Sequence, residues 1–324
     1  MRIGFSLGSI LSIDQIIECS KILSHHNADS LWIPETWGMD SGSMIATVLQ
    51  LVKTPKLGTS IINIYSRSPS LIAMTAATLD TLSGGRLILG LGTSSQTIVE
   101  DWHGVAFEHP LDRMREYVEI IRLILSGQKA NYQGNELSLK NFDLLIKPPR
   151  KKIPIYLAAI NQRMVDLTWD IADGVIFYLR PLTELKETVQ RMQNKKRIDT
   201  TCQIITSISE DSDKAISRAK KTIAFYVSVG KIYREFLATH GFEKETKAIF
   251  TEYKKSGLKD NHQQVSDRMV NELSICGTPE TVQKKITQFV KAGIDLPILQ
   301  FNPVDDNVKE SFNLLVSTLA SDMN

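Results

Sequence analysis

Short apolar runs rich in β-branched residues alternate along the chain with longer amphipathic stretches. Each run ends in small or turn-forming residues, as buried parallel strands do. The runs predict eight strands, over Arg2–Gly8, Ser30–Glu35, Lys56–Asn63, Arg86–Gly92, Pro154–Ile160, Gly174–Leu179, Thr201–Ser209 and Pro297–Phe301.

The stretches between these runs have apolar residues at helical spacing. Ser12 and Gln15 form a capping-box pattern, and Pro69 and Gly85 stand at the two ends of another helix. The expected helices are Ser12–His26, Met44–Val52, Pro69–Gly85, Pro110–Gly127, Gln162–Ala172, Leu182–Lys195, Thr278–Gly293 and a last one ending near Ala320. Residues 131–147 are expected to form an inserted loop with extended segments.

Eight strand–helix units favour an α/β fold of the (β/α)8 TIM barrel type over the alternative, an open doubly wound sheet. The polar region Asp211–Glu272 is too long for an ordinary crossover and predicts a helical insertion before the last strand. We therefore expect one domain over residues 1–324, with an inserted helical region at about 230–261.

Composition narrows the class of protein. The 324 residues carry a net charge of only +2, which disfavours a nucleic-acid partner. No apolar run reaches the roughly 20 residues of a membrane-spanning helix. The first residues lack a secretory signal pattern, so we expect a cytoplasmic protein with no membrane contact. Cys19, Cys202 and Cys276 show no disulfide spacing, and the histidines show no metal-binding pair, so no metal site is expected.

Three titratable side chains follow strands of the predicted barrel, where barrel sites lie. Glu35, at the end of the second strand, suits a ligand-orienting or proton-transfer group; an ion pair or a helix cap is the alternative. His103, after the fourth strand, suits a proton donor, although a lone histidine is often structural. Glu100 is either the partner of His103 or a solvated loop charge.

The glycine-rich run Gly90–Ser95 carries the first part of a dinucleotide-binding pattern. Ser95 stands where the third glycine belongs, and the run follows the fourth strand instead of the first, so the pattern disfavours that fold. The other interpretation is that Gly90 and Gly92 let this strand pack closely and turn. Trp32 and Trp37 flank Glu35 and are either walls for a flat ring or parts of the core.

The end of the fifth strand predicts an anion site. Ala158 and Ala159 are small enough for close backbone approach, and a helix begins at about Asn161. Free N–H groups and the positive helix end attract an anion, to which Arg163 in the first turn adds charge. A plain strand–helix turn is the alternative.

Five segments together resemble the bacterial luciferase-like flavin and deazaflavin oxidoreductase superfamily. Their order is most similar to its coenzyme F420-dependent branch, which includes methylenetetrahydromethanopterin reductase. The segments are SLWIPETWG, LGTSIINIYSRSPSLIAMTAATLDTLSGGRLILGLGTSS, EDWHGVAFEHPLDRMREYVEIIRLILSG, IPIYLAAINQRMVDLTWDIADGVIF and CGTPETVQKKI.

The resemblance implies a (β/α)8 barrel with a tricyclic cofactor ring in its mouth. It places a cis peptide bond at Ser60–Ile61 and the proton-handling acid at Glu35. It also assigns residues to three parts of the cofactor: Ser60, Ile61 and Asn63 to one face of the ring, Gly92, Thr93 and Ser94 to the ring or its ribityl chain, and Ala158, Ala159, Ile160 and Asn161 to the tail phosphate.

Two departures limit what the resemblance implies about substrate. Ser6 and Ser95 stand where relatives have an acid, which leaves Glu35, Glu100 and His103 as proton-handling candidates. We expect an enzyme, a coenzyme F420-dependent oxidoreductase that transfers a hydride between the deazaflavin and a small organic or pterin-type substrate, acting as a homodimer. The alternatives are an FMN-dependent luciferase-like monooxygenase and a non-catalytic flavin-binding protein.

Overall fold

In the computed structural model, which describes residues 1–8, 10–150 and 152–323, parallel strands close into a barrel. Closure comes from the pairing of β9 with β10, so the doubly wound alternative is excluded. All the strands of the barrel were predicted from the apolar runs. In order around the barrel they are β1 (Gly4–Ser6), β2 (Ser30–Ile33), β3 (Lys56–Thr59), β5 (Leu87–Gly92), β8 (Ile155–Ala158), β9 (Gly174–Tyr178), β10 (Asp199–Ile208) and β12 (Leu296–Phe301).

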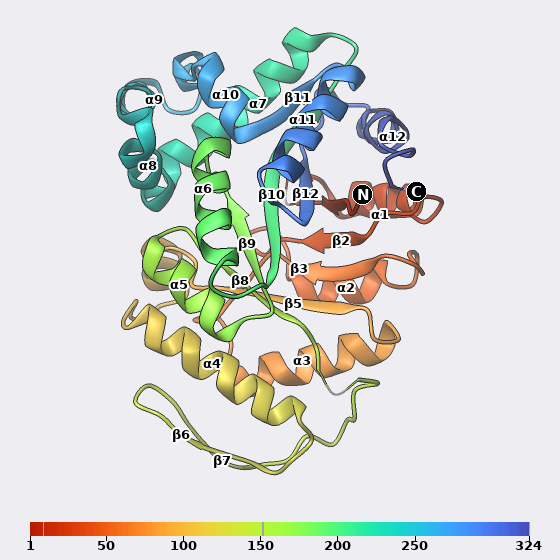
Figure 1. Ribbon diagram of the computed structural model, residues 1–324, viewed down its shortest axis with the longest axis vertical. Coiled ribbons are helices and arrows are strands. Elements are labelled where there is room, and N and C mark those ends of the chain that lie inside the picture. Colours follow the sequence, from red (N-terminus) through yellow and green to blue (C-terminus); the bar gives the residue numbers. More distant parts are fainter. Residues whose placement is uncertain (9, 151, 324) are drawn as a thin grey trace.

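Helices surround the barrel, as Figure 1 shows. The predicted capping box is present, since the Ser12 hydroxyl accepts the Gln15 N–H and the Gln15 side chain accepts the Ser12 N–H. No helix in the described ranges is long and apolar enough to cross a membrane. The outer helices are α1 (Ile13–Leu23), α2 (Ser41–Val48), α3 (Pro69–Leu82), α4 (Pro110–Leu125), α5 (Gln162–Ile171), α6 (Leu182–Gln193), α11 (Pro279–Lys291) and α12 (Val308–Thr318).

A helical region stands between β10 and β12, at the top of Figure 1. It has its own buried apolar cluster, which includes Ile223, Leu237 and Ile249. The region extends beyond the expected range of about 230–261, and its last part is a short strand, β11, that the sequence did not indicate. Its elements are α7 (Ser212–Val229), α8 (Lys231–Leu237), the π-helix Ala238–Phe242, α9 (Glu243–Ser256), the 3-10 helix Asn261–Gln264, α10 (Asp267–Leu273) and β11 (Ser274–Gly277), which pairs with β10.

The inserted segment after α4 forms an antiparallel hairpin of β6 (Ala130–Gln133) and β7 (Ser138–Phe142), which lies outside α4 in Figure 1. Buried Glu116 of α4 holds the turn of this hairpin. Its carboxylate accepts the backbone N–H groups of Asn135 and Leu137, both at 2.7 Å. The expected extended segments are therefore anchored to the outer helix α4.

Apolar side chains fill the barrel interior, among them Trp32, Tyr156 and Ile176. Trp32 is fully buried, and its indole N–H donates to the Ser30 hydroxyl at 2.8 Å. Gly58 faces this indole so closely that an added Cβ would lie 2.2 Å from the ring. Trp32 is thus a core residue, the second of its two interpretations, because it is fully buried in the cluster that fills the barrel interior.

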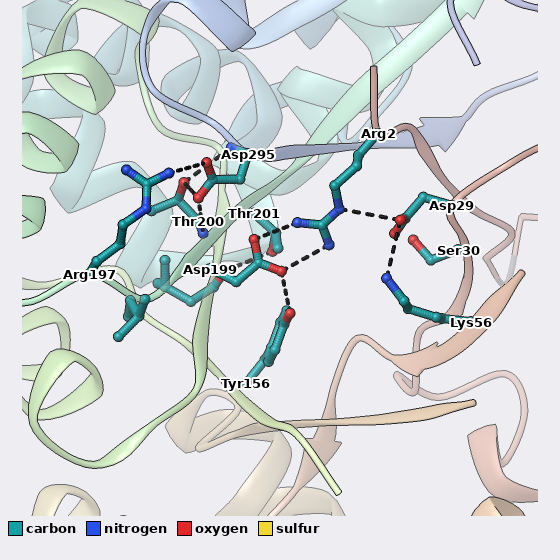
Figure 2. A network of polar contacts seen from close by, with 12 residues as sticks. Arg2, Asp29, Ser30, Lys56, Tyr156, Arg197, Asp199, Thr200, Thr201 and Asp295 are labelled. Carbon is teal, nitrogen blue, oxygen red and sulfur yellow. Dashed lines mark hydrogen bonds and ion pairs between the residues drawn. The ribbon is translucent and has the colours of Figure 1, made fainter. Parts of the chain in front are cut away.

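A polar network closes the amino-terminal end of the barrel (Figure 2). The guanidinium of Arg2 donates to both oxygens of Asp199, at 2.8 and 2.9 Å, and to Asp29 at 3.2 Å. The Tyr156 hydroxyl also donates to Asp199. Because Asp29 additionally pairs with Lys56 of β3, the network joins the starts of several strands. The network thus ties the amino-terminal ends of these strands to one another.

Candidate functional site at the carboxyl end of the barrel

The carboxyl ends of β2, β4 (Ile62–Asn63) and β5 open into a pocket of about 400 Å³. Four of the residues that the sequence predicted, from separate segments, line this pocket: Glu35, Asn63, Ser94 and His103. Trp37 and Arg67 line it too. The structure therefore brings two of the three expected proton-handling residues, and two of the expected ring-binding residues, together at one mouth.

Both carboxylate oxygens of Glu35 have donors. Oε1 accepts from Arg67 Nη1 at 2.5 Å, and Oε2 accepts from Arg67 Nη2 at 2.9 Å. The backbone N–H and the hydroxyl of Ser41 also donate to Oε2, at 3.1 and 3.0 Å. Glu35 thus combines the ion pair and the helix cap that were its alternative interpretation. Hydrogen bonding to Glu35 also raises the pKa of the Arg67 guanidinium.

His103 follows a π-helix, Ile98–Trp102, that forms directly after β5. Its backbone N–H donates to the Ile98 carbonyl at 3.2 Å, which fixes the chain direction at the pocket rim. The imidazole is exposed, and no residue in the described part of the chain forms a hydrogen bond with it. His103 therefore has both ring nitrogens available to a ligand.

Glu100 does not line the pocket. Its carboxylate accepts from the backbone N–H of Phe107 at 3.2 Å and from the Gln96 amide at 2.9 Å. These bonds tie the loop that carries His103 back onto itself. The geometry favours a bracing role for Glu100, and no contact pairs it with His103.

The strand that would back a cofactor ring breaks between β3 and β4. The peptide bond Ser60–Ile61 is cis, as expected. Two polar atoms here, Ser60 Oγ and Asn63 Nδ2, are buried and have no partner among the described residues, whereas Asn63 Oδ1 accepts from the Tyr65 N–H at 2.9 Å. Buried polar groups are nearly always paired, so two unpaired ones at a pocket favour a polar ligand.

The loop after β5 lies against the same strand break. A Cβ added to Gly92 would lie 2.6 Å from Ile61 Cδ1, so a larger residue here would require the Ile61 side chain to move. Ser94 has a left-handed backbone, with φ of 59°, and Thr93 and Ser94 are both half-buried. Ser95 accepts from the Ile98 N–H at 3.4 Å and so begins the π-helix instead of facing the pocket.

The turn after β8 leads into helix α5, and both of its interpretations, an anion site and a plain strand–helix turn, stay open. Asn161 caps α5, and its side chain accepts the Met164 N–H at 3.0 Å. Its φ of −78° is extended, so no left-handed conformation is needed. Buried Arg180 donates to the Ile160 carbonyl at 2.5 Å, and Arg163 is exposed in the first helical turn. Ala158 and Ile160 are half-buried and Ala159 is buried.

Aromatic residues on the rim were only partly predicted. Trp37 and Trp102 are each more than half exposed, and their rings meet edge to face with centroids 5.2 Å apart. Phe225 of α7 lies 6.1 Å from Trp37. Arg67 is far in sequence from its partner Glu35, and Phe225 is far from its partner Trp37. The sequence could have indicated the second contact only if Phe225 had been recognised as part of a helix stripe.

Comparisons with known proteins find similar chains and a shared fold. The profile of the family described as luciferase-like monooxygenase matches residues 2–296. The 5,10-methylenetetrahydromethanopterin reductase of Archaeoglobus fulgidus is 29% identical over 309 residues, which cover 91% of each chain.

Two solved structures share the fold. The coenzyme F420 dependent tetrahydromethanopterin reductase of Methanopyrus kandleri has a TM-score of 0.88 at 24% identity, covering 100% of this chain and 99% of its own. An F420-dependent secondary alcohol dehydrogenase in complex with an F420-acetone adduct has a TM-score of 0.76 at 18% identity, covering 98% of this chain and 97% of its own. At these identities the likeness supports the barrel fold.

Proposed function

Since this chain belongs to the luciferase-like monooxygenase family, we propose that it is a coenzyme F420-dependent oxidoreductase. It transfers a hydride between the deazaflavin and a small organic or pterin-type substrate. The family that the sequence resembled is confirmed. F420 is favoured over FMN because curated sequence relatives that match along most of the chain are named 5,10-methylenetetrahydromethanopterin reductase or putative coenzyme F420-dependent oxidoreductase.

This proposal rests on two buried atoms without a hydrogen-bond partner among the described residues, Ser60 Oγ and Asn63 Nδ2. They lie beside Gly92, which packs closely against Ile61. They lie at the strand break where the ring was expected. Leaving polar groups buried and unpaired costs roughly 1–3 kcal/mol each. A flat polar ring would satisfy both, so the residues present fit the cofactor.

In this proposal, three segments bind the cofactor. Ser60, Ile61 and Asn63 support one face of the ring, and Gly92, Thr93 and Ser94 contact the ring or its ribityl chain. The turn of Ala158, Ala159, Ile160 and Asn161 holds the tail phosphate, with added charge from Arg163. Bound F420 supplies a ring carbon that gives or accepts a hydride, and the chain supplies orientation and proton transfer.

His103 is the residue we assign to proton transfer at the substrate, through an imidazole nitrogen. Both nitrogens are without a partner in the described part of the chain, and the ring lines the pocket. Glu35 positions Arg67 and the start of α2, since its two oxygens already accept from Arg67 and Ser41. Glu100 braces the loop of His103. A catalytic role for Glu35 or Glu100 stays a prediction.

Turnover under controlled oxygen tests the reaction class. Reduced F420 should be oxidised by an acceptor without oxygen, with loss of reductant matched one to one by a two-electron-reduced product. Product that requires reduced FMN and oxygen would instead identify a monooxygenase. Tight cofactor binding with no turnover on any of a broad set of acceptors would favour a non-catalytic flavin-binding protein.

A homodimer belongs to the same proposal. Leu71, Met74 and Leu82 form an apolar stripe on α3, and each is about half exposed. Such a stripe is suited to packing against a second copy. A cytoplasmic location also stays a prediction.

A further inference from the structure

Helix α7 brings one face to the carboxyl ends of the barrel strands. The Thr222 hydroxyl donates to Asn302 Oδ1, just past β12, at 2.9 Å. Phe225 reaches Trp37, just past β2, and Tyr226 packs on Tyr178 of β9 with centroids 5.0 Å apart. Thus the middle of α7 contacts the ends of three barrel strands, and the side chains on this face border the mouth.

Arg218 lies on the same stripe of α7, since it precedes Thr222 by four residues and Phe225 by seven. It is half-buried, and this burial lowers the pKa of its guanidinium. No hydrogen bond or ion pair joins that guanidinium to any residue in the described ranges. An unpaired, partly desolvated cation is costly, so an anionic partner would be strongly favoured.

The strands below this part of α7 also leave polar atoms unpaired. Ser6 Oγ of β1 and Gln203 Oε1 of β10 are buried and have no partner within the described ranges. These two strands flank β12, which ends at Phe301, one residue before the Asn302 that bonds to Thr222. The unpaired groups lie on the β10–β12–β1 side of the mouth, whereas the expected ring site is on the β3–β5 side. Both observations indicate a second polar subsite.

We propose that Arg218 recognises an anionic group, a carboxylate or a phosphate, on the substrate. The inference rests on the proposed function and narrows its substrate class to acceptors or donors that carry a negative charge. The guanidinium forms two parallel hydrogen bonds to such a group, while the reacting carbon faces the cofactor. The cofactor's own phosphate is assigned to the turn after β8, from which β12 is separated by β9 and β10.

Equilibrium binding tests this role without turnover. The F420-loaded protein is titrated calorimetrically with glutarate, inorganic phosphate and the neutral analogue glutaramide. The wild type should bind at least one anion and not glutaramide. Arg218→Gln should weaken anion binding by about tenfold or more, and Arg218→Lys by less. Arg197→Gln is the matched control, because Arg197 is 79% exposed and lies before β10 at the opposite end of the barrel.

Equal anion affinity in wild type and Arg218→Gln, or no anion binding by the wild type, would overturn the proposal. Thermal unfolding of each variant checks that Arg218→Gln remains folded, and Arg218→Lys keeps the charge if it does not. A second series compares F420 with its phosphate-free deazaflavin core. If Arg218→Gln weakens F420 but not the core, Arg218 holds the cofactor tail and the substrate assignment is wrong.

The same anion titrations on cofactor-free protein separate this inference from the proposed function. Anion binding that depends on Arg218, in a chain that fails to bind F420, would contradict the function and support the subsite. F420 binding, together with anion binding that does not depend on Arg218, would support the proposed function and contradict the subsite.

Discussion

The Glu35 carboxylate and the Arg67 guanidinium form a two-point ion pair at the pocket wall, with oxygen–nitrogen distances of 2.5 and 2.9 Å. The side chains are 11% and 21% exposed, so the pair is largely shielded from water. Arg67 is held from behind as well, because its carbonyl accepts the Tyr117 hydroxyl at 2.8 Å. Glu35, the acid that the sequence indicated at the end of a strand, therefore supports the pocket wall through its contact with Arg67.

Glu35→Gln should therefore act first on stability. Loss of the charge weakens the bonds from Arg67, and we expect unfolding free energy to fall by about 1–3 kcal/mol in urea denaturation. Glu280→Gln is the control, since it removes only an exposed pair with Lys284 and should change little. Unchanged stability together with lost hydride transfer would instead identify Glu35 as the catalytic acid.

His103→Gln should act on chemistry. Removal of a general acid lowers turnover by roughly 10²-fold or more. Cofactor affinity should stay within a factor of about two, because the loop backbone that forms the ring site is unchanged. Parallel measurement of kcat and of the F420 dissociation constant checks this. A large loss of affinity with unchanged kcat would assign His103 to cofactor binding.

From the buried hydroxyl of Tyr156 we predict that the folded state loses stability at high pH. Burial, followed by the neighbouring Asp199, raises the pKa of its hydroxyl well above the ordinary value. The folded state therefore keeps a proton that the unfolded state releases above about pH 10. Its contribution is complete below that pH and declines above it, by about 1.4 kcal/mol per pH unit. Tyr156→Phe should show a shallower decline between pH 10 and 11 in denaturant unfolding, and an identical slope would contradict the assignment.

Met74→Glu should separate the proposed dimer. A carboxylate in the middle of the α3 stripe would be buried without a partner at the interface. Light scattering after size exclusion should then report a dimer for the wild type and a monomer for the variant. Gln128→Glu, exposed beyond α4, adds the same charge elsewhere and should stay dimeric. A wild type that is monomeric at all concentrations would remove the dimer proposal.

Sequence periodicity was sufficient for the barrel because each strand is a compact apolar run with its own end signals. Sequence periodicity did not indicate the short elements. For example, β11 (Ser274–Gly277) follows helix α10 without a break, and only its pairing with β10 makes it a strand. The π-helix Ile98–Trp102 was missed for a similar reason, since its wide turn depends on Ser95 and on the loop that Glu100 braces.

Site residues were predictable where they lie at strand ends and not where they depend on long-range partners. Glu35 and His103 follow strands, so their approach to the mouth was foreseen. The ion-pair partner of Glu35 was not, because Arg67 lies 32 residues away in sequence. The sequence did not distinguish Trp32 from Trp37 as a ring wall or a core residue. In the structure Trp32 is buried inside the barrel and Trp37 is exposed at the rim. The cis bond at Ser60–Ile61 came from the resemblance alone.

Cofactor titration tests the central claim most directly. Purified protein is titrated with coenzyme F420 and, separately, with FMN, and ring absorbance or fluorescence reports the bound fraction. The Ser60→Val variant, which lacks one polar group at the strand break, is titrated in the same way. We predict saturable F420 binding that is at least about tenfold tighter than FMN binding and weaker in Ser60→Val. Tighter binding of FMN, or no binding of either, would contradict the account.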